Sequence, residues 1–266
     1  LLFRWLMRFL RSMNQKQMLQ SVKALTEISN FSLKSYSELN QKYPGLFGFE
    51  QKGLLMVGQT RGGVQAAIQE MELVAKHGVP GKFLDERSVR ELEPALTGRL
   101  EGGVYFPAEA HAEPLAVVQT LVKACQELGA VIVPRTEVFE FVSQTGASGS
   151  SYRIDHLRTT RGNFKADTFV LATGSWSPGL ARQLGLNVPI LGGKGYSLIV
   201  KPFLPAPQLP LMLVEKKVAV TPREGSIRLA GTLELVDGDD SITPRRVDAI
   251  LRGARQFLNV PETPEI

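Results

Sequence analysis

The expected fold of this 266-residue chain is decided by one stretch of its sequence, Thr168-Phe169-Val170-Leu171-Ala172-Thr173-Gly174-Ser175-Trp176-Ser177. Residues 168–172 form an apolar run, which is typical of a strand buried on both faces of a parallel sheet. The small residues that follow let the backbone approach a ligand closely, and the free N–H groups of the next helix favour a pyrophosphate. The stretch therefore predicts the strand–turn–helix unit of a Rossmann-like fold, with a tight turn that binds nothing as the alternative.

The residues around this stretch, 113–185, continue the α/β pattern. Apolar residues recur at helical spacing over 113–128, with Pro114 in the first turn and Gly129 at the end. Further along, we expect strands at 131–133 and 137–142, a hairpin that pairs 152–158 with 163–165, and a helix over 176–184. This order predicts a partial nucleotide-binding domain over residues 107–186.

The flanking sequences have a different character. Residues 1–106 contain predicted helices at 2–12, 15–42, 61–77 and 85–92, with strands at 52–58 and 102–106. Beyond Pro189, strands at 196–200, 211–214, 218–221 and 227–235 alternate like an antiparallel sheet, and a helix follows over 245–258. We therefore expect a combination of α/β and α+β structure, in which residues 1–106 and 187–266 supply an antiparallel-sheet substrate domain interleaved with the nucleotide-binding domain.

The composition excludes several classes of protein. The net charge is +5, but Lys and Arg are scattered, so we expect no nucleic-acid partner. The single cysteine, Cys125, cannot form an internal disulfide and fits a reducing, cytoplasmic compartment. The three histidines lack neighbours at metal-ligand spacing, so we expect no metal site. No apolar run reaches the roughly 18 residues of a membrane-spanning helix.

The N-terminal residues 1–12 predict an amphipathic helix instead of a signal peptide. Arg4, Arg8 and Arg11 share one helical face and interrupt the apolar run, and no small-residue cleavage site follows them. The opposite face carries Leu2, Trp5, Leu6 and Phe9. We interpret this segment as a surface helix packed on its own domain. The alternative is a peripheral contact of residues 1–12 with the anionic inner face of the cell membrane.

The glycine-rich turn that such a fold uses to grip a dinucleotide is missing. That turn has the pattern G-x-G-x-x-G between a strand and a helix. The glycines over 58–63 and 192–195 have the wrong spacing, and Gly102-Gly103 precedes a strand. The sequence also begins with Leu1 instead of Met, so we expect a truncated chain.

Several short motifs occur in a fixed order along nearly the whole chain. They are Gly102-Gly103-Val104-Tyr105-Phe106-Pro107, His111-Ala112-Glu113-Pro114, Ala172-Thr173-Gly174-Ser175-Trp176-Ser177-Pro178, Lys194-Gly195-Tyr196-Ser197-Leu198, and Arg228-Leu229-Ala230-Gly231-Thr232-Leu233-Glu234-Leu235 before Pro244-Arg245-Arg246. In this order the chain resembles the D-amino-acid oxidase family of FAD-dependent amine oxidoreductases, and within it the bacterial D-amino acid dehydrogenases. The resemblance implies a fragment that lacks the N-terminal dinucleotide-binding motif and the C-terminal end.

The resemblance also implies a function for the parent enzyme, the oxidative deamination of D-amino acids to 2-oxo acids and ammonia by hydride transfer to FAD. The residues that it places at the cofactor are Val138, Ala172, Thr173, Gly174 and Trp176. Those that it places near the substrate are Lys194, Tyr196 and Arg223. It names no catalytic residue, because the arginine that clamps the substrate carboxylate in relatives belongs to a Gly-Leu-Arg-Pro segment that this sequence does not contain.

The resemblance leaves three functions open. A D-amino acid dehydrogenase passes electrons to a quinone or the respiratory chain, at the inner face of the cell membrane. An oxidase of the glycine or sarcosine type passes them to oxygen. Ala219 stands where some oxidases of the family place a tyrosine, which favours the dehydrogenase. The third alternative is that the truncated chain is a non-catalytic domain.

Overall fold

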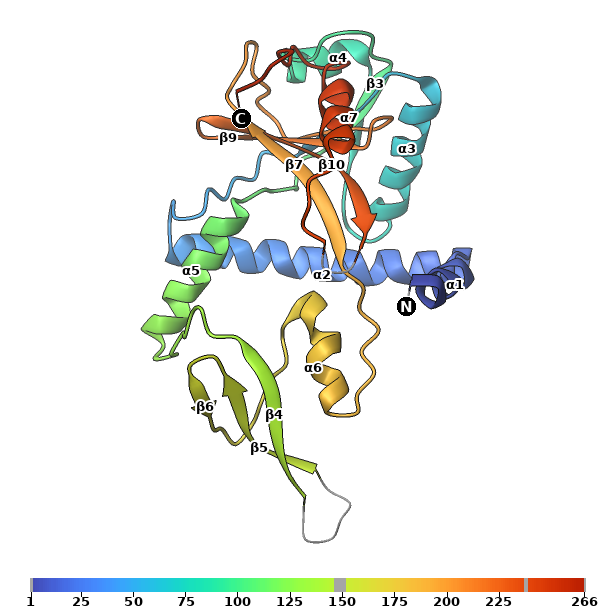
Figure 1. The fold of residues 1–266 in the computed structure, drawn as a ribbon. Helices are drawn as coiled ribbons and strands as arrows, with labels where there is room; N and C mark the ends of the chain where they lie inside the picture. Colours follow the sequence, from blue (N-terminus) through green and yellow to red (C-terminus); the bar gives the residue numbers. More distant parts are fainter. Residues whose placement is uncertain (1, 146–151, 237–238, 266) are drawn as a thin grey trace. The chain divides into compact units, whose positions relative to one another are not determined.

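The computed structural model describes residues 2–145, 152–236 and 239–265, and it divides into two compact units (Figure 1). Unit 1 consists of Leu1–Leu10, Ala124–Gly193 and Leu235–Asp239. Unit 2 consists of Arg11–Lys123, Lys194–Glu234 and Asp240–Ile266. Each unit therefore draws on three separated stretches of the chain, and each is described by itself.

Unit 2 is built on a seven-stranded sheet with the order β2-β3-β1-β8-β9-β10-β7. Its strands are β1 (Leu54–Gly58), β2 (Lys82–Leu84), β3 (Gly102–Phe106), β7 (Gly193–Val200), β8 (Leu211–Leu213), β9 (Val218–Arg223) and β10 (Ser226–Leu235). Strand β1 runs antiparallel to β3 but parallel to β8, so the sheet is mixed and not wholly antiparallel as expected. A parallel pair needs a crossover connection, which the long chain between β1 and β8 supplies.

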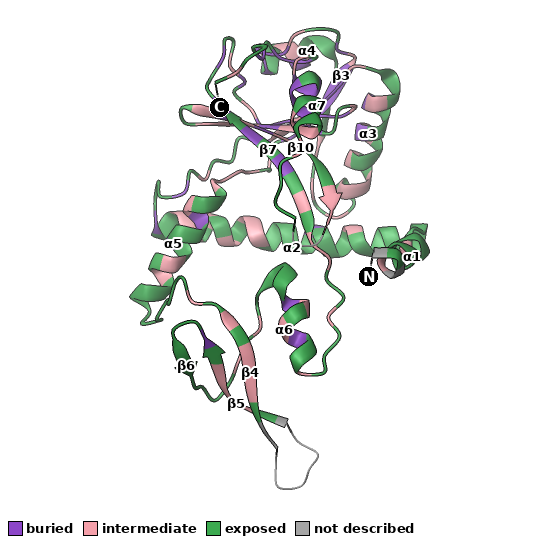
Figure 2. Cartoon of the chain, viewed as in Figure 1, coloured by how far each residue is buried: buried purple, intermediate pink, exposed green. Residues whose placement is uncertain are grey.

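Helices cover both faces of this sheet. On one face, α3 (Arg61–Ala75) packs Ala67 and Met71 against Met56 of β1 and Val104 of β3. On the other face lie α4 (Glu86–Leu92) and α7 (Pro244–Ala254), whose buried side chains join Leu55, Val57, Leu198, Val220, Ile227 and Leu229 in the larger core. Successive strand residues alternate between the two cores, as the pleat requires. Figure 2 shows the buried residues concentrated in these strands and helices.

The remaining long helices are α1 (Leu2–Ser12), α2 (Gln15–Lys42) and α5 (Pro114–Glu127). The first two form where the sequence predicts them. The Asn14 side chain caps α2 by accepting a hydrogen bond from Gln17 N at 3.0 Å. Only Thr26 of α2 is buried, and most of the helix is exposed (Figure 2). Within the described ranges, no helix combines the length and the apolar character that crossing a bilayer would require.

Unit 1 contains a three-stranded antiparallel sheet of β4 (Val138–Thr145), β5 (Tyr152–Thr159) and β6 (Gly162–Phe164). Strands β5 and β6 are the predicted hairpin. A 3-10 turn (Gly174–Trp176) leads into α6 (Ser177–Gln183). The Gln183 side chain ties α6 to β4, because its Oε1 accepts from Phe141 N at 3.1 Å and its Nε2 donates to Phe139 O at 2.8 Å.

Two predicted strands of unit 1 do not form. Residues 131–133 and 168–172 belong to no strand of the described part, and Val131 and Val170 are each 85% exposed. The prediction of a strand buried on both faces over 168–172 is therefore wrong for this structure. A strand exists only where a neighbour takes up its backbone hydrogen bonds, and the described residues of unit 1 place no strand beside either run.

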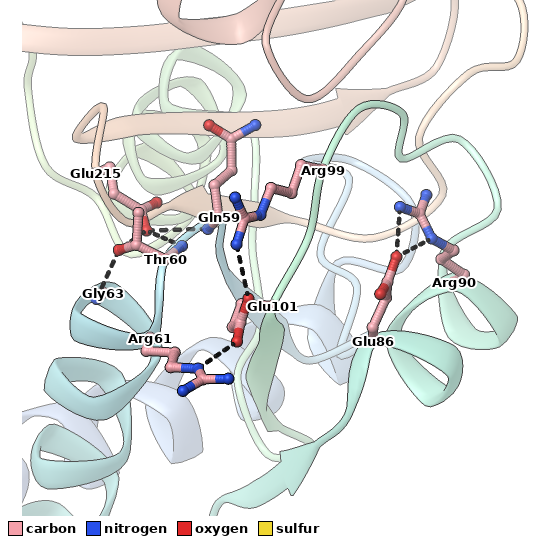
Figure 3. Close-up of polar contacts among 9 residues, drawn as sticks. All are labelled: Gln59, Thr60, Arg61, Gly63, Glu86, Arg90, Arg99, Glu101 and Glu215. Carbon is pink, nitrogen blue, oxygen red and sulfur yellow. Dashed lines mark hydrogen bonds and ion pairs between the residues drawn. The ribbon is translucent and has the colours of Figure 1, made fainter.

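The carboxylate of Glu215, just after β8, fixes the first turn of α3 (Figure 3). Its Oε1 accepts hydrogen bonds from Gln59 N at 2.9 Å, Thr60 N at 3.0 Å and Thr60 Oγ1 at 2.9 Å. Gly63 lies so close that a Cβ there would stand 2.2 Å from the same oxygen. A negative charge at a helix N-terminus satisfies N–H groups that the helix leaves unpaired. This contact joins β1, α3 and β8.

A second carboxylate, Glu93, is completely buried at the end of α4. Its Oε2 accepts from Gln208 N at 2.7 Å and Leu209 N at 2.9 Å, and its Oε1 accepts from Ala95 N at 3.2 Å. Buried polar groups are stable only when they are hydrogen-bonded. Glu93 therefore fastens the chain that enters β8 to the end of α4.

Candidate functional site

Lys194 and Tyr196, which the sequence places near a substrate, lie together on β7 in unit 2 and share one partner on β10. The Tyr196 hydroxyl donates to Glu234 Oε2 at 2.5 Å, and Lys194 Nζ lies 3.3 Å from the same oxygen. Lys194 Nζ also donates to the backbone oxygen of Ser241 at 2.9 Å. The side chains of Lys194 and Tyr196 are therefore held in place by contacts with other residues of unit 2.

Helix α7 completes this group, which we call the Glu234 cluster: Lys194, Tyr196, Glu234, Thr243 and Arg246. Arg246 Nε lies 2.9 Å from Glu234 Oε1, and Thr243 Oγ1 is hydrogen-bonded to the Tyr196 hydroxyl at 3.1 Å. The two cations flank the Tyr196 ring, with Lys194 Nζ at 5.6 Å and Arg246 Cζ at 5.7 Å from its centroid. The hydrogen bond from Tyr196, then those cations, lower the pKa of Glu234, so this carboxyl stays ionised.

Arg223, at the end of β9, belongs to a different group of unit 2. Its Nη1 lies 2.5 Å from Oε2 of Glu113, the residue just before α5. Its Nε is buried and has no hydrogen-bond partner among the described residues. A cavity of about 360 Å³ opens beside it, with His111 and Ser226 in its wall.

His111 lies in the wall of the same cavity. Its Nε2 is 3.3 Å from Glu50 Oε2, whereas its Nδ1 is buried without a described hydrogen-bond partner. Burial is the main cause that lowers the pKa of His111; Glu50 opposes it, while Lys52 and Arg223 add to it. The imidazole is therefore neutral at neutral pH, with one ring nitrogen unused.

The predicted cofactor residues lie in unit 1. Val138 begins β4 and is paired with Thr159. Ala172 and Thr173 precede the 3-10 turn, and Gly174 opens it with φ +54°. Trp176 is 79% exposed at the end of this turn.

These residues do not by themselves make an FAD site. The run over 168–172 belongs to no strand of the described structure, and a Cβ on Gly174 would meet no described atom within 4 Å. Helix α6 has only seven residues, and the sequence has no G-x-G-x-x-G turn for the pyrophosphate. The described residues thus leave the cofactor phosphates without a binding turn.

The comparisons with known proteins identify the family. Residues 4–266 match the family model described as FAD dependent oxidoreductase. The chain belongs to this family. As a member of the FAD-dependent oxidoreductases, it is similar to curated D-amino acid dehydrogenases: that of Vibrio atlanticus is 29% identical over 257 residues, which cover 93% of this chain and 60% of the relative. The enzyme of Neisseria gonorrhoeae is 29% identical over 252 residues, 92% of this chain and 58% of the relative.

Two solved structures share the fold of this chain. Glycine oxidase from Geobacillus kaustophilus matches with a TM-score of 0.73 at 23% identity, over 96% of this chain and 65% of its own. Glycine oxidase from Bacillus cereus matches with a TM-score of 0.74 at 22% identity, over 95% of this chain and 66% of its own. The chain therefore spans about three fifths of the length of the curated relatives it matches.

Sequence reasoning missed the partners in both groups. Glu234 and Arg246 appear in the motifs only as neighbours of other residues, and nothing local indicates that a carboxylate on β10 meets Tyr196 of β7. The sequence predicts Glu113 only as the first residue of a helix, and nothing local indicates that it meets Arg223 at the end of β9.

Proposed function

We propose that the protein containing this chain carries out the oxidative deamination of D-amino acids to 2-oxo acids and ammonia, with FAD as its cofactor. The observation that carries the proposal is the 29% identity to D-amino acid dehydrogenases across 93% of the chain. The similarity includes the stretches that form unit 1 and those that form unit 2. In this proposal, unit 2 is the substrate domain and unit 1 is part of the FAD-binding domain.

The roles of individual residues belong to the proposal too. In unit 2, we infer that Arg223, beside the start of β10, faces the substrate. Lys194 and Tyr196, which Glu234 holds near the other end of β10, are inferred to bind substrate as a separate group. In unit 1, the residues inferred to contact the cofactor are Val138, Ala172, Thr173, Gly174 and Trp176. Because the chain has no pyrophosphate turn of its own, these contacts require a G-x-G-x-x-G segment from outside residues 1–266.

The electron acceptor and the membrane contact are a further part of the proposal. A quinone or another component of the respiratory chain would accept the electrons, and α1 would touch the membrane surface. The exposed apolar side chains of α1, Phe3, Phe9 and Leu10, support this contact, because a basic amphipathic helix binds anionic lipid with its apolar face.

A second candidate function is a glycine oxidase-type reaction, in which oxygen accepts the electrons. The fold similarity to the two glycine oxidases favours it. The small Ala219 on β9, which offers no hydroxyl to a substrate, favours the dehydrogenase.

One experiment separates these functions. The protein containing this chain is purified with FAD and mixed with D-alanine, L-alanine, glycine or sarcosine, while a redox dye and hydrogen peroxide are both followed. We expect dye reduction with D-alanine and little peroxide. Peroxide formation from glycine or sarcosine would favour the oxidase. A purified protein that binds no flavin, or whose flavin no amino acid reduces, would contradict both functions and leave a non-catalytic domain.

A further inference from the structure

Strand β10 changes the face to which its side chains point just before Glu234. Leu229 is completely buried in the larger core of unit 2, and a Cβ on Gly231 would contact side chains of the same core. Because side chains alternate along a strand, Leu233 should come next on this face. Leu233 is instead 62% exposed. Glu234 takes its place, since its carboxylate is bonded to Tyr196, which belongs to that core.

The change of face occurs at Thr232. Its φ of +55° lies in the left-handed region, which a β-branched residue adopts only under strain. A left-handed residue inside a strand turns the side chains that follow towards the other face, as in a β-bulge. Such strain persists only where the surrounding structure fixes it, and it is common at functional sites. At Thr232 the strained backbone brings Glu234 to Tyr196 and to the two cations around that ring.

The Glu234 cluster joins stretches of chain at the places where they enter or leave unit 2. The chain passes between the units after residues 10, 123, 193, 234 and 239. Lys194 is the first residue of unit 2 after the third passage, and Glu234 is the last before the fourth. Lys194 Nζ donates to the backbone oxygen of Ser241, just beyond the fifth passage, and Arg246 reaches Glu234 from α7, which follows it. Three of the five passages are therefore tied together by one group of contacts.

These contacts are partly shielded from water. The side chains of Lys194, Glu234 and Arg246 are 16%, 20% and 34% exposed. Ion pairs at the open surface contribute little because water and salt screen them, whereas shielded pairs are screened much less. The hydroxyl of Thr243, just before α7, is bonded to that of Tyr196 on β7. The cluster therefore holds together the start of β7, the end of β10 and the start of α7.

We propose that the Glu234 cluster is a clamp, which makes the start of β7, the end of β10 and the start of α7 open and close together. These are the ends at which unit 2 is joined to residues 124–193 and 235–239 of unit 1. Without the clamp each end would open separately, because the ends of strands and helices are among the least stable parts of a fold. The clamp uses contacts that these side chains already make, so it depends neither on the substrate contact proposed for Lys194 and Tyr196 nor on the proposed reaction.

The test is amide hydrogen exchange, followed by mass spectrometry, on the purified protein that contains this chain. Glu234→Gln removes the charge of the central side chain and keeps its shape. We expect exchange to become about tenfold faster at all three ends, the effect of losing one charged hydrogen-bonded pair. Strand β9, in the middle of the sheet, should change less than about twofold, because the clamp acts only on the ends.

The matched control is Glu101→Gln, just before β3. The Glu101 carboxylate also lies between two cations, Arg61 at 3.1 Å and Arg99 at 3.5 Å, and its side chain is 25% exposed (Figure 3). In the sheet, β3 is separated from β10 and β7 by β1, β8 and β9. This control should change exchange at the three ends less than about twofold.

A second variant keeps the test decisive if Glu234→Gln does not fold. Arg246→Gln alters only α7, at a side chain that is 34% exposed. A clamp predicts faster exchange in β7 and β10 as well, whereas a contact that merely stabilises α7 predicts a change in α7 alone. The second result would overturn the proposal, as would a change at only one of the three ends in Glu234→Gln. A rise of equal size in β9, or at the three ends in Glu101→Gln, would overturn it too, because the effect would then not belong to the clamp.

Discussion

Replacing the buried carboxylate of Glu93 should lower the stability of unit 2 by a measurable amount. Glu93→Ala leaves three backbone N–H groups, those of Ala95, Gln208 and Leu209, without an acceptor in a fully buried place. Each such loss costs about 1–3 kcal/mol, and partial relaxation reduces the sum, so we expect about 3–5 kcal/mol. Glu93→Gln keeps one carbonyl oxygen for Gln208 and Leu209 but turns its amide NH2 group towards the N–H of Ala95, and we expect a loss of stability of about 1–2 kcal/mol.

The assay is urea unfolding of the purified chain, followed by circular dichroism and fitted for midpoint and slope. The matched control is Glu91→Gln on the exposed side of α4, where the carboxylate pairs with Arg87 at the surface. We expect this control to cost less than about 0.5 kcal/mol. If Glu93→Gln and Glu91→Gln unfold at the same urea concentration as the wild type, the hydrogen bonds of Glu93 do not stabilise the fold and the reasoning is refuted.

Three further predictions concern other contacts. The pKa of Glu234 is lowered in the folded protein, so the stabilisation it gives is complete at a pH above the ordinary pKa of a glutamate and is lost as pH falls through the folded pKa. Glu234→Gln should therefore flatten the acid side of a plot of stability against pH. An unchanged acid side would contradict the role given to the Glu234 cluster. Burial lowers the pKa of His111, so the folded protein loses stability as pH falls below about 6.5, the pKa of an unperturbed histidine. His111→Gln should remove the part of the fall in melting temperature between pH 7 and pH 5 that this histidine causes. Gly63→Ala should destabilise α3 because its Cβ would strike Glu215, whereas Gly62→Ala, with nothing within 4 Å, should raise stability by up to about 1 kcal/mol in the same melts.

Local sequence signals predicted most elements of the fold. The bounds of β3 and of the helices α1 and α2 agree with the expectation, because glycine, proline and Asn14 mark their ends in the sequence itself. The prediction failed where structure depends on a distant neighbour. The run over 168–172 has the composition of a buried strand but no pairing strand in the described structure, and β1 gained a parallel partner that no local pattern indicates.

The candidate site was predictable only in part. Motif order singled out Lys194 and Tyr196, and the structure shows that they share one partner. That partner, Glu234, could not be found without knowing that β10 lies beside β7.

The parallel pairing of β1 with β8 has a consequence for how the chain folds during synthesis. Gln59, just after β1, binds Glu215, just after β8, across 156 residues of sequence. A ribosome adds about 5–20 residues per second, so β1 must wait many seconds for its neighbour to be synthesised. Meanwhile β1 can pair only with β3, and one of its apolar edges stays open. The nascent chain therefore passes through a long interval in which chaperones or self-association compete with correct folding.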